Sequence, residues 1–231
     1  MSIIQYLEDG KTNDPKSLHS TVYVEVLEDI LTGKLKAGTK ITEQKICNEY
    51  KVSRTPVREA LCKLEAAGLI ETIPNRGAFV VGLSERDIDD ILELRTSCEV
   101  SAIKWAIERI TDDELAELEE SFEFMEFYTM KQDIDKMISI NAAFHKIIHN
   151  ATHNAGLINQ LAAYNIYVKY CRPSDYTLPG YLDMVFQEHR EIYKAIMDKD
   201  TSAAVIAMMD HMNNSVKRRE RLKEKNNRTN K

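Results

Sequence analysis

The stretch that decides the fold of this chain is VSRTPVREAL, residues 52–61. Its apolar residues recur at helical spacing; they are Val57, Ala60 and Leu61. Ser53 precedes them as an N-cap residue. Pro56 falls in the first turn, where backbone N–H groups have no partner within the helix, so the N–H group that proline lacks is not missed. The stretch therefore predicts the start of a helix that carries Arg54 and Arg58 on its other side.

The sequence around this stretch predicts a small unit of three helices and a hairpin. The expected elements are helices over 18–32, 42–50 and 53–67, and strands over 69–73 and 78–81. The turn Pro74-Asn75-Arg76-Gly77 separates the two strands. Helix, short helix, tight turn, helix and hairpin, in this order, are typical of a winged helix-turn-helix domain.

The rest of the chain shows helical periodicity with hardly a strand signal. Helices are expected near 85–109, 112–130, 133–152, 155–171, 179–198 and 201–222, which form an antiparallel bundle. Capping-box patterns open the first two of these helices, at Ser84 and Thr111. Pro173 and Pro179 mark a loop between two helices. The predicted fold is mainly α, with a winged helix-turn-helix domain followed by an all-α bundle.

A length of 231 residues fits two modest domains. We expect an N-terminal arm over 1–17, the winged domain over 18–82, the helical domain over 84–220 and a disordered basic tail over 221–231. No signal peptide pattern and no run of about 18 apolar residues occurs, so the sequence predicts a cytoplasmic protein that makes no contact with a membrane.

The net charge of −6 hides an uneven distribution. Residues 34–63 hold eight Lys or Arg against three Glu, whereas residues 83–216 hold 12 basic against 24 acidic residues. A polyanion is therefore expected to meet the N-terminal third or the basic tail, because the middle of the chain would repel it.

The expected recognition helix carries Arg54, Thr55 and Arg58 in its N-terminal turns, on the side away from its apolar stripe. A recognition helix contacts base edges with these turns. The planar fork of arginine can donate two hydrogen bonds to guanine or hold a phosphate, and the first helical N–H groups around Ser53 can hold another phosphate. The alternative is a merely solvated helix face, which the surrounding architecture disfavours.

Residues 41–80, ITEQKICNEYKVSRTPVREALCKLEAAGLIETIPNRGAFV, closely resemble the DNA-binding domain of the GntR family of bacterial transcription regulators. The resemblance implies DNA contacts by Arg54, Thr55, Arg58, Arg76 and Gly77, the last two at the tip of the wing. The chain departs from some members at Gln44, where they have an arginine. A glutamine there can still donate a hydrogen bond, without the charge.

Two kinds of polar residue stand on helix faces that should be apolar. Arg95 shares a face with Ile91 and Leu92, and a buried arginine needs a partner. That partner is either Glu99, one turn later, or the carboxylate of a bound ligand.

Three histidines of three different helices also face inward: His145, His189 and His211. Asn141 precedes the first of these histidines by one turn. A single histidine of this kind is more often a core residue than a metal ligand, and periodicity does not separate His145 from His149 and His153.

Residues 84–220 are similar to the FCD effector domain of this family, in the six-helix form of its VanR-like branch. The motifs that carry the similarity are Leu94-Arg95, Phe144-His145, Glu188-His189-Arg190 and Asp210-His211. The resemblance implies that Asn141, His145, His189 and His211 bind a divalent metal, with zinc first and nickel or another transition metal as alternatives. It also implies a small carboxylate effector facing Arg95.

The sequence thus predicts a transcription regulator, not an enzyme, that binds a double-stranded DNA operator as a homodimer. Two other classes of protein compete with this hypothesis. An architectural DNA-binding protein would use the bundle for dimerisation alone and would lack a polar cavity. A metal-dependent hydrolase would need a general base near the metal, and the pattern offers no inward carboxylate beyond Glu99.

Overall fold

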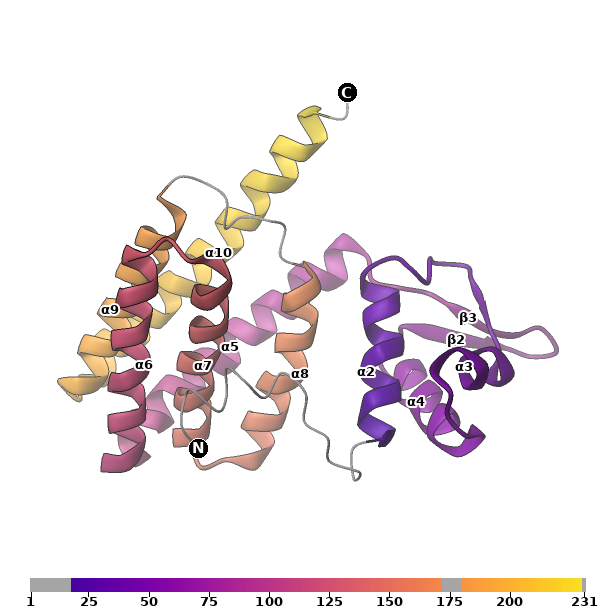
Figure 1. Ribbon diagram of the computed structural model, residues 1–231, viewed down its shortest axis with the longest axis horizontal. Coiled ribbons are helices and arrows are strands. Elements are labelled where there is room, and N and C mark those ends of the chain that lie inside the picture. The colour runs from indigo at the N-terminus through magenta and orange to yellow at the C-terminus, as the bar shows by residue number, and fades with distance from the viewer. Residues whose placement is uncertain (1–17, 172–179, 230–231) are drawn as a thin grey trace. The chain divides into compact units, whose positions relative to one another are not determined.

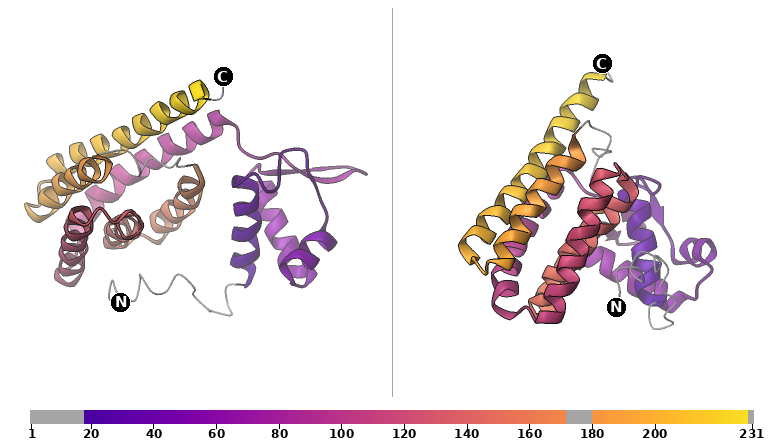
Figure 2. Two further views of the ribbon diagram at one scale, coloured as in Figure 1. Left: turned by 45° about the horizontal axis from the view of Figure 1, so that its top comes forward. Right: turned by 60° about the vertical axis from the view of Figure 1, so that its left-hand side comes forward.

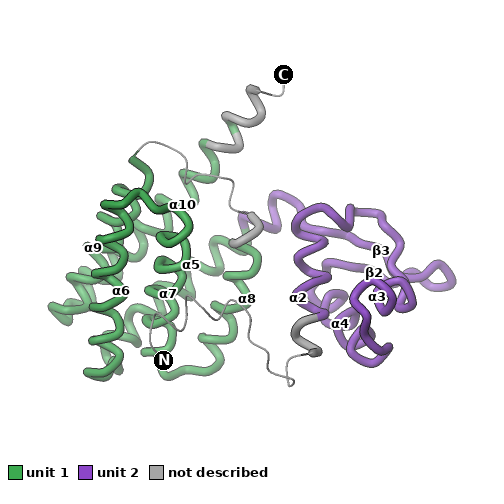
Figure 3. The backbone as a smooth tube through the Cα atoms, viewed as in Figure 1, with its two compact units in different colours: residues 1–11, 90–231 green, residues 12–89 purple. Residues whose placement is uncertain are grey.

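The structure is a computed structural model that describes residues 18–171 and 180–229 (Figure 1). The described residues form two compact units, one up to Asp89 and one from Asp90 onward (Figure 3). The division falls inside a single helix, α5 (Glu85–Arg109). The expected N-terminal arm and the loop over 172–179 lie outside the described residues.

The N-terminal unit has the predicted winged helix-turn-helix architecture. Its elements are α2 (Leu18–Leu31), β1 (Lys40–Ile41), α3 (Glu43–Tyr50), α4 (Arg54–Ala66), β2 (Ile70–Ile73) and β3 (Gly77–Val80). The strands form one antiparallel sheet in the order β1-β3-β2, with Glu71 opposite Phe79 and Lys40 on the other side of Phe79. Strand β1 was not predicted, because two residues are too few to show a period of two.

Helix α4 is held by its apolar stripe, which packs against α2. Val57, Ala60 and Leu64 are all at most 1% exposed, so this side of α4 forms the core and the opposite side remains in solvent. Helix α3 ends at Lys51, whose left-handed backbone (φ +56°) makes the tight turn before α4. Thr42 caps α3 as predicted, whereas Ser53, at the N-cap of α4, makes no side-chain cap hydrogen bond.

The C-terminal unit contains only helices in its described part (Figure 2). After α5 come α6 (Asp112–Met130), α7 (Ile134–Ala151), α8 (Ala155–Cys171), α9 (Tyr181–Met197) and α10 (Thr201–Thr229). Helix α6 packs against α7 and α9, and α9 packs against α10. The bundle agrees with the predicted fold class. Among the described residues, no helix has the length and apolar character needed to cross a membrane.

The predicted capping boxes explain where α5 and α6 begin. The Ser84 amide donates to Asp87 Oδ2 (2.7 Å), and the Asp87 amide donates to Ser84 Oγ (3.2 Å). Thr111 and Glu114 make the same reciprocal pair of hydrogen bonds at the start of α6. Each box satisfies backbone donors that the first turn of a helix leaves without partners.

The last helix is longer than the predicted range of 201–222. Helix α10 continues to Thr229. Lysine, arginine and glutamate are good helix formers, and extending an existing helix requires far less free energy than starting one. The first half of α10 is packed in the bundle core through Ala204, Met208 and Met212, so it supplies the nucleus for that extension.

Candidate functional site

The first candidate site is the exposed side of α3 and α4. Arg54 and Arg58 lie there in solvent, next to exposed Thr55. An Arg54 terminal nitrogen donates to Gln44 Oε1 (3.3 Å), which brings the predicted residues of the two helices together. Ser53 is also exposed at the N-terminus of α4. The site therefore combines two cationic forks, two hydroxyls and an amide on one surface.

Glu43 is a member of this surface that the sequence did not indicate. Its carboxylate accepts a hydrogen bond from Arg58 Nε (2.7 Å), and this bond holds the pKa of Glu43 below its usual value. The bond engages Nε, whereas the paired terminal nitrogens of an arginine form the fork that fits guanine or phosphate. Glu43 can thus orient Arg58 without occupying that fork.

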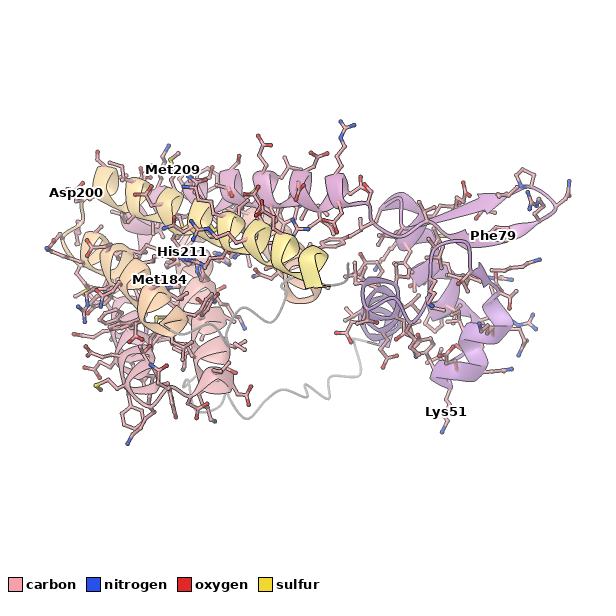
Figure 4. All side chains as sticks on the ribbon, turned by 90° about the horizontal axis from the view of Figure 1, so that it is seen from above. Lys51, Phe79, Met184, Asp200, Met209 and His211 are labelled. Atoms are coloured by element: carbon pink, nitrogen blue, oxygen red, sulfur yellow. The ribbon has the colours of Figure 1, made fainter. Side chains whose placement is uncertain are left out.

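The wing tip holds the remaining residues predicted to contact DNA. Arg76 is exposed and its guanidinium lies 5.7 Å from the centre of the Phe79 ring, which Figure 4 labels. Gly77 has φ +99°, and a Cβ atom there would lie 3.1 Å from Lys40 Cε. Both the backbone conformation and the close approach of Lys40 therefore favour glycine at this position.

The second candidate site is a cluster of three buried histidines inside the helical unit. His145 comes from α7, His189 from α9 and His211, labelled in Figure 4, from α10. They are 3%, 0% and 4% exposed, and one ring nitrogen of each lies within 4.8 Å of the others. The structure brings together the three histidines that the sequence selected.

The surroundings of two of the three rings fix which nitrogen carries the proton. His189 Nδ1 donates to the Val185 carbonyl oxygen (2.7 Å), and His211 Nδ1 donates to Glu188 Oε2 (2.9 Å). His145 Nδ1 lies 3.6 Å from Glu99 Oε2, beyond hydrogen-bond distance. With Nδ1 protonated in His189 and His211, the Nε2 atoms of these two rings carry lone pairs, the form in which imidazole binds a metal.

The geometry fits a transition-metal ion. His145 Nε2 and His189 Nε2 lie 3.3 Å apart, close to the roughly 3.3 Å between two nitrogens that share a tetrahedral zinc ion. Burial lowers the pKa of His145 and, still more, that of His189, so both imidazoles stay neutral. Lone pairs that face each other in a buried site repel unless a cation lies between them. Half-buried Asn141 lines the same pocket as His211.

Arg95 has a protein partner on α5 itself. One of its terminal nitrogens donates to Glu99 Oε1 (3.0 Å), and the other oxygen of Glu99 lies 2.9 Å from His149 Nε2. Burial alone would raise the pKa of Glu99, but His145 and Arg95 hold it well below the usual value. Of the two partners considered from the sequence, the structure shows Glu99. His149 therefore belongs to this carboxylate cluster.

A second carboxylate cluster joins α9 to α10. Glu188 accepts hydrogen bonds from His211, from Asn214 Nδ2 (3.0 Å) and from both terminal nitrogens of Arg218 (2.7 and 3.0 Å). Sequence reasoning missed these contacts. The signal available was the polar stripe of α10, where His211, Asn214 and Arg218 recur at helical spacing.

Comparisons with known proteins identify both halves of the chain. Residues 18–80 match the family described as bacterial regulatory proteins, gntR family, and residues 90–214 match the FCD domain. The chain belongs to the GntR family of regulators and carries an FCD domain. It is therefore a transcription regulator with a helix-turn-helix DNA-binding domain, as the sequence predicted.

Similar proteins of this GntR family span nearly the whole chain. The HTH-type regulator YdhC of Bacillus subtilis (strain 168) is 29% identical over 90% of this chain and 93% of its own length. The HTH-type transcriptional repressor RspR of Escherichia coli (strain K12) is 25% identical over 88% of this chain and 90% of its own. The solved structure of E. coli McbR/YncC has the same fold, with a TM-score of 0.68 at 22% identity, over 89% of this chain and 98% of that one.

Proposed function

We propose that this GntR-family regulator binds a pseudo-palindromic DNA operator as a dimer, and that a metal ion and a small organic acid in the FCD domain modulate this binding. The observation that carries the proposal is the convergence of His145, His189 and His211 in a buried site, where one ring nitrogen of each lies within 4.8 Å of the others.

The proposed DNA interface consists of seven residues of the winged domain: Gln44, Ser53, Arg54, Thr55, Arg58, Arg76 and Gly77. Exposure of the two arginines of α4 supports the assignment, since they are available to bases or phosphates in the major groove. Gln44, which lies beside Arg54, is suited to an adenine, because an amide can bond both the N6 and the N7 of that base.

The proposed metal site consists of His145, His189 and His211, with Asn141 as a further oxygen ligand. Imidazole nitrogens suit zinc first, and nickel or another transition metal next. A bound ion of this kind supplies a Lewis acid with an open coordination position, to which an acid oxygen can bind. Hydrogen bonds from Nδ1 orient two of the three rings, so the protein holds them in place for the ion.

We further propose that the FCD domain forms the dimer. Large apolar side chains are exposed on several of its helices, among them Leu94 on α5, and Ile206 and Met209 on α10. A two-fold dimer would cover such side chains and would present two recognition helices to the two halves of an operator. Light scattering at micromolar concentration tests this, and a monomer under those conditions contradicts it.

Hydrolysis is the less suitable function for the histidine cluster. A hydrolytic site needs a free carboxylate or another base next to the metal-bound water. The two carboxylates beside the cluster, buried Glu99 and partly buried Glu188, are each held by an arginine. The buried histidine cluster likewise disfavours a purely architectural role, which would require no group of polar side chains in the bundle core.

Two measurements on the natively purified protein test the proposed function. Mass spectrometry under native conditions is expected to find a metal ion in each chain, together with any acid retained on purification. Selection from a random DNA duplex library is expected to recover a two-fold symmetric sequence, which Arg54→Ala and Arg58→Ala no longer enrich. A protein that enriches no sequence, or that holds no metal after purification in zinc-containing medium, contradicts the proposal.

A further inference from the structure

The last turns of α10 are basic, in a helical domain that is otherwise acidic. Residues 217–231 hold eight Lys or Arg against two Glu, whereas residues 83–216 hold 12 basic against 24 acidic residues. The helix continues to Thr229. Because each residue turns an α-helix by about 100°, four of these cations occupy positions on one side of α10. We call them the basic stripe: Lys217, Arg221, Lys225 and Arg228.

The basic stripe occupies the side of α10 that does not pack in the bundle. Met208, which is 0% exposed, stands on the opposite side of the helix, and Lys217 and Arg221 are exposed. The neighbouring helix α9 begins at Tyr181, and the centre of the Tyr181 ring lies 5.5 Å from the guanidinium carbon of Arg218. From that point α10 continues beyond the start of α9, so the stripe is available to an outside partner.

The stability of the helix does not explain the basic stripe. Cations near a C-terminus interact favourably with the helix dipole, but this effect is confined to the last turn, and Lys217 and Arg221 precede Thr229 by more than one turn. Like charges four positions apart destabilise a helix, and Lys217, Arg221 and Lys225 have this spacing. The stripe therefore opposes helix formation slightly, and a partner outside the helix explains it better.

We propose that the basic stripe of α10 is a second DNA contact of this protein, which binds phosphates of the duplex while α4 contacts the bases. The inference rests on the DNA-binding part of the proposed function and is independent of the metal and the organic acid. It gives the helical domain, whose remaining surface would repel a polyanion, a place where it can contact DNA.

The charge density of DNA favours it as the partner. Lys217 and Arg228 are separated by about 16 Å along the helix axis, a length over which duplex DNA carries roughly nine negative charges. Phosphates neutralised by lysine and arginine release counterions, which adds a favourable free energy to each contact. The acidic surface of a second copy of the chain is the competing partner, but exposed ion pairs between proteins contribute little.

Two lysines provide a matched pair of substitutions. Lys225 belongs to the basic stripe, whereas Lys223 stands about 200° away around the helix axis, nearly on the opposite side. Lys225→Gln should reduce the slope of log Kd against log salt concentration by about 0.9, the value for one phosphate contact, and Lys223→Gln should leave the slope unchanged. Replacing Arg221, Lys225 and Arg228 together by Gln should reduce it by roughly 2–3.

The experiment uses the full chain and two duplexes of equal length, the selected operator and an unrelated sequence. Fluorescence anisotropy measures Kd over a series of KCl concentrations. Because phosphate contacts carry no sequence information, the triple variant should weaken binding to both duplexes by the same factor, whereas Arg54→Ala should weaken binding to the operator more. Glutamine is a good helix former, and thermal unfolding checks that each variant keeps the fold.

Two results overturn the inference directly: a wild-type slope in the triple variant, or an equal loss of slope in Lys223→Gln and Lys225→Gln. Light scattering tests the competing partner, and a triple variant that dimerises less while its DNA slope is unchanged assigns the stripe to a second copy of the chain. Loss of binding to phosphatidylglycerol vesicles, again at an unchanged DNA slope, assigns it to a membrane surface. Both outcomes overturn the DNA contact.

The wild-type chain separates failure of this inference from failure of the proposed function. A wild type that selects an operator, together with a triple variant of unchanged slope, contradicts the inference alone. A wild type that binds neither duplex contradicts the proposed DNA-binding function, and the second contact with it.

Discussion

Two arginine–glutamate pairs of this protein have nearly the same bond length and very different surroundings. Arg58 and Glu43 lie 2.7 Å apart on the recognition surface, with side chains 63% and 36% exposed. Arg95 and Glu99 lie 3.0 Å apart inside the helical unit, with side chains 4% and 0% exposed. The shorter contact is the one in water, where charges are screened and an ion pair contributes little to stability. The distance between the charged atoms therefore does not tell which of the two pairs contributes more to stability.

The difference separates residues that act on an outside partner from residues that must be satisfied within the fold. On the recognition surface, water can replace Glu43, so Arg58 can leave it for DNA at little cost. In the helical unit, a charge without a partner would be left in a medium that solvates it poorly. Buried Glu99 accordingly has contacts with both Arg95 and His149.

The largest expected effect is on metal content. His189→Ala removes one of three imidazoles, and the protein should change from a stoichiometric metal complex to one that retains little metal after dialysis. Native mass spectrometry or elemental analysis measures this. His153→Asn is the control: it changes an exposed histidine with φ +50°, a conformation that asparagine tolerates, and should keep the metal. Full metal content in His189→Ala would place the metal elsewhere.

The second prediction compares the two glutamates directly. Glu99→Ala leaves Arg95 buried without its carboxylate and should lower the free energy of unfolding of the metal-free protein by about 3–5 kcal/mol. Glu43→Ala should leave it nearly unchanged, because Arg58 is then solvated. Urea unfolding of both variants in the presence of EDTA measures the two losses in the free energy of unfolding. Equal losses would show that burial does not set the strength of these pairs.

The third prediction reverses the comparison by measuring binding in place of stability. Arg54→Ala should weaken binding to the selected duplex by roughly 1–3 kcal/mol and leave the free energy of unfolding unchanged. Fluorescence anisotropy at one fixed salt concentration measures the affinity. Lys63→Ala, an exposed cation in the last turn of the same helix, is the control and should have a much smaller effect. Identical affinities of Arg54→Ala and wild type would remove α4 from the recognition surface.

The smallest expected effect is the pH dependence of the stability that Glu114 contributes through the capping box at the start of α6. Burial alone would raise the pKa of Glu114, but hydrogen bonds from Thr111 and His153 hold it below the usual 4.5. The charge therefore stabilises the fold at pH values above 4.5, and this stabilisation is lost as the pH falls through the lower folded-state pKa. Glu114→Gln should cost about 0.3–1 kcal/mol at neutral pH and nothing in strong acid. Parallel unfolding curves at both pH values test this.

The sequence was sufficient for most of the fold because the decisive signals are local. The apolar spacing of α4, the caps at Thr42 and Thr111 and the turn before β3 act within a few residues, so helices and strands begin and end close to the predicted positions. It was insufficient where an element takes its stability from elsewhere. Strand β1 exists because β3 pairs with it, and the end of α10 is helical because the packed half of that helix precedes it.

The sequence by itself determined the family of the chain and, through helical spacing and resemblance, which histidines face inward. Only the tertiary structure decided the partners of these residues: Glu188 for His211, Glu99 for both Arg95 and His149, and Arg218 beside the pocket. The physical reason is that the sequence signals act over a few residues, whereas these contacts join residues far apart in the chain. Periodicity fixes the face of a helix on which a side chain stands, whereas a hydrogen bond between α9 and α10 depends on how the two helices pack, which no local pattern encodes.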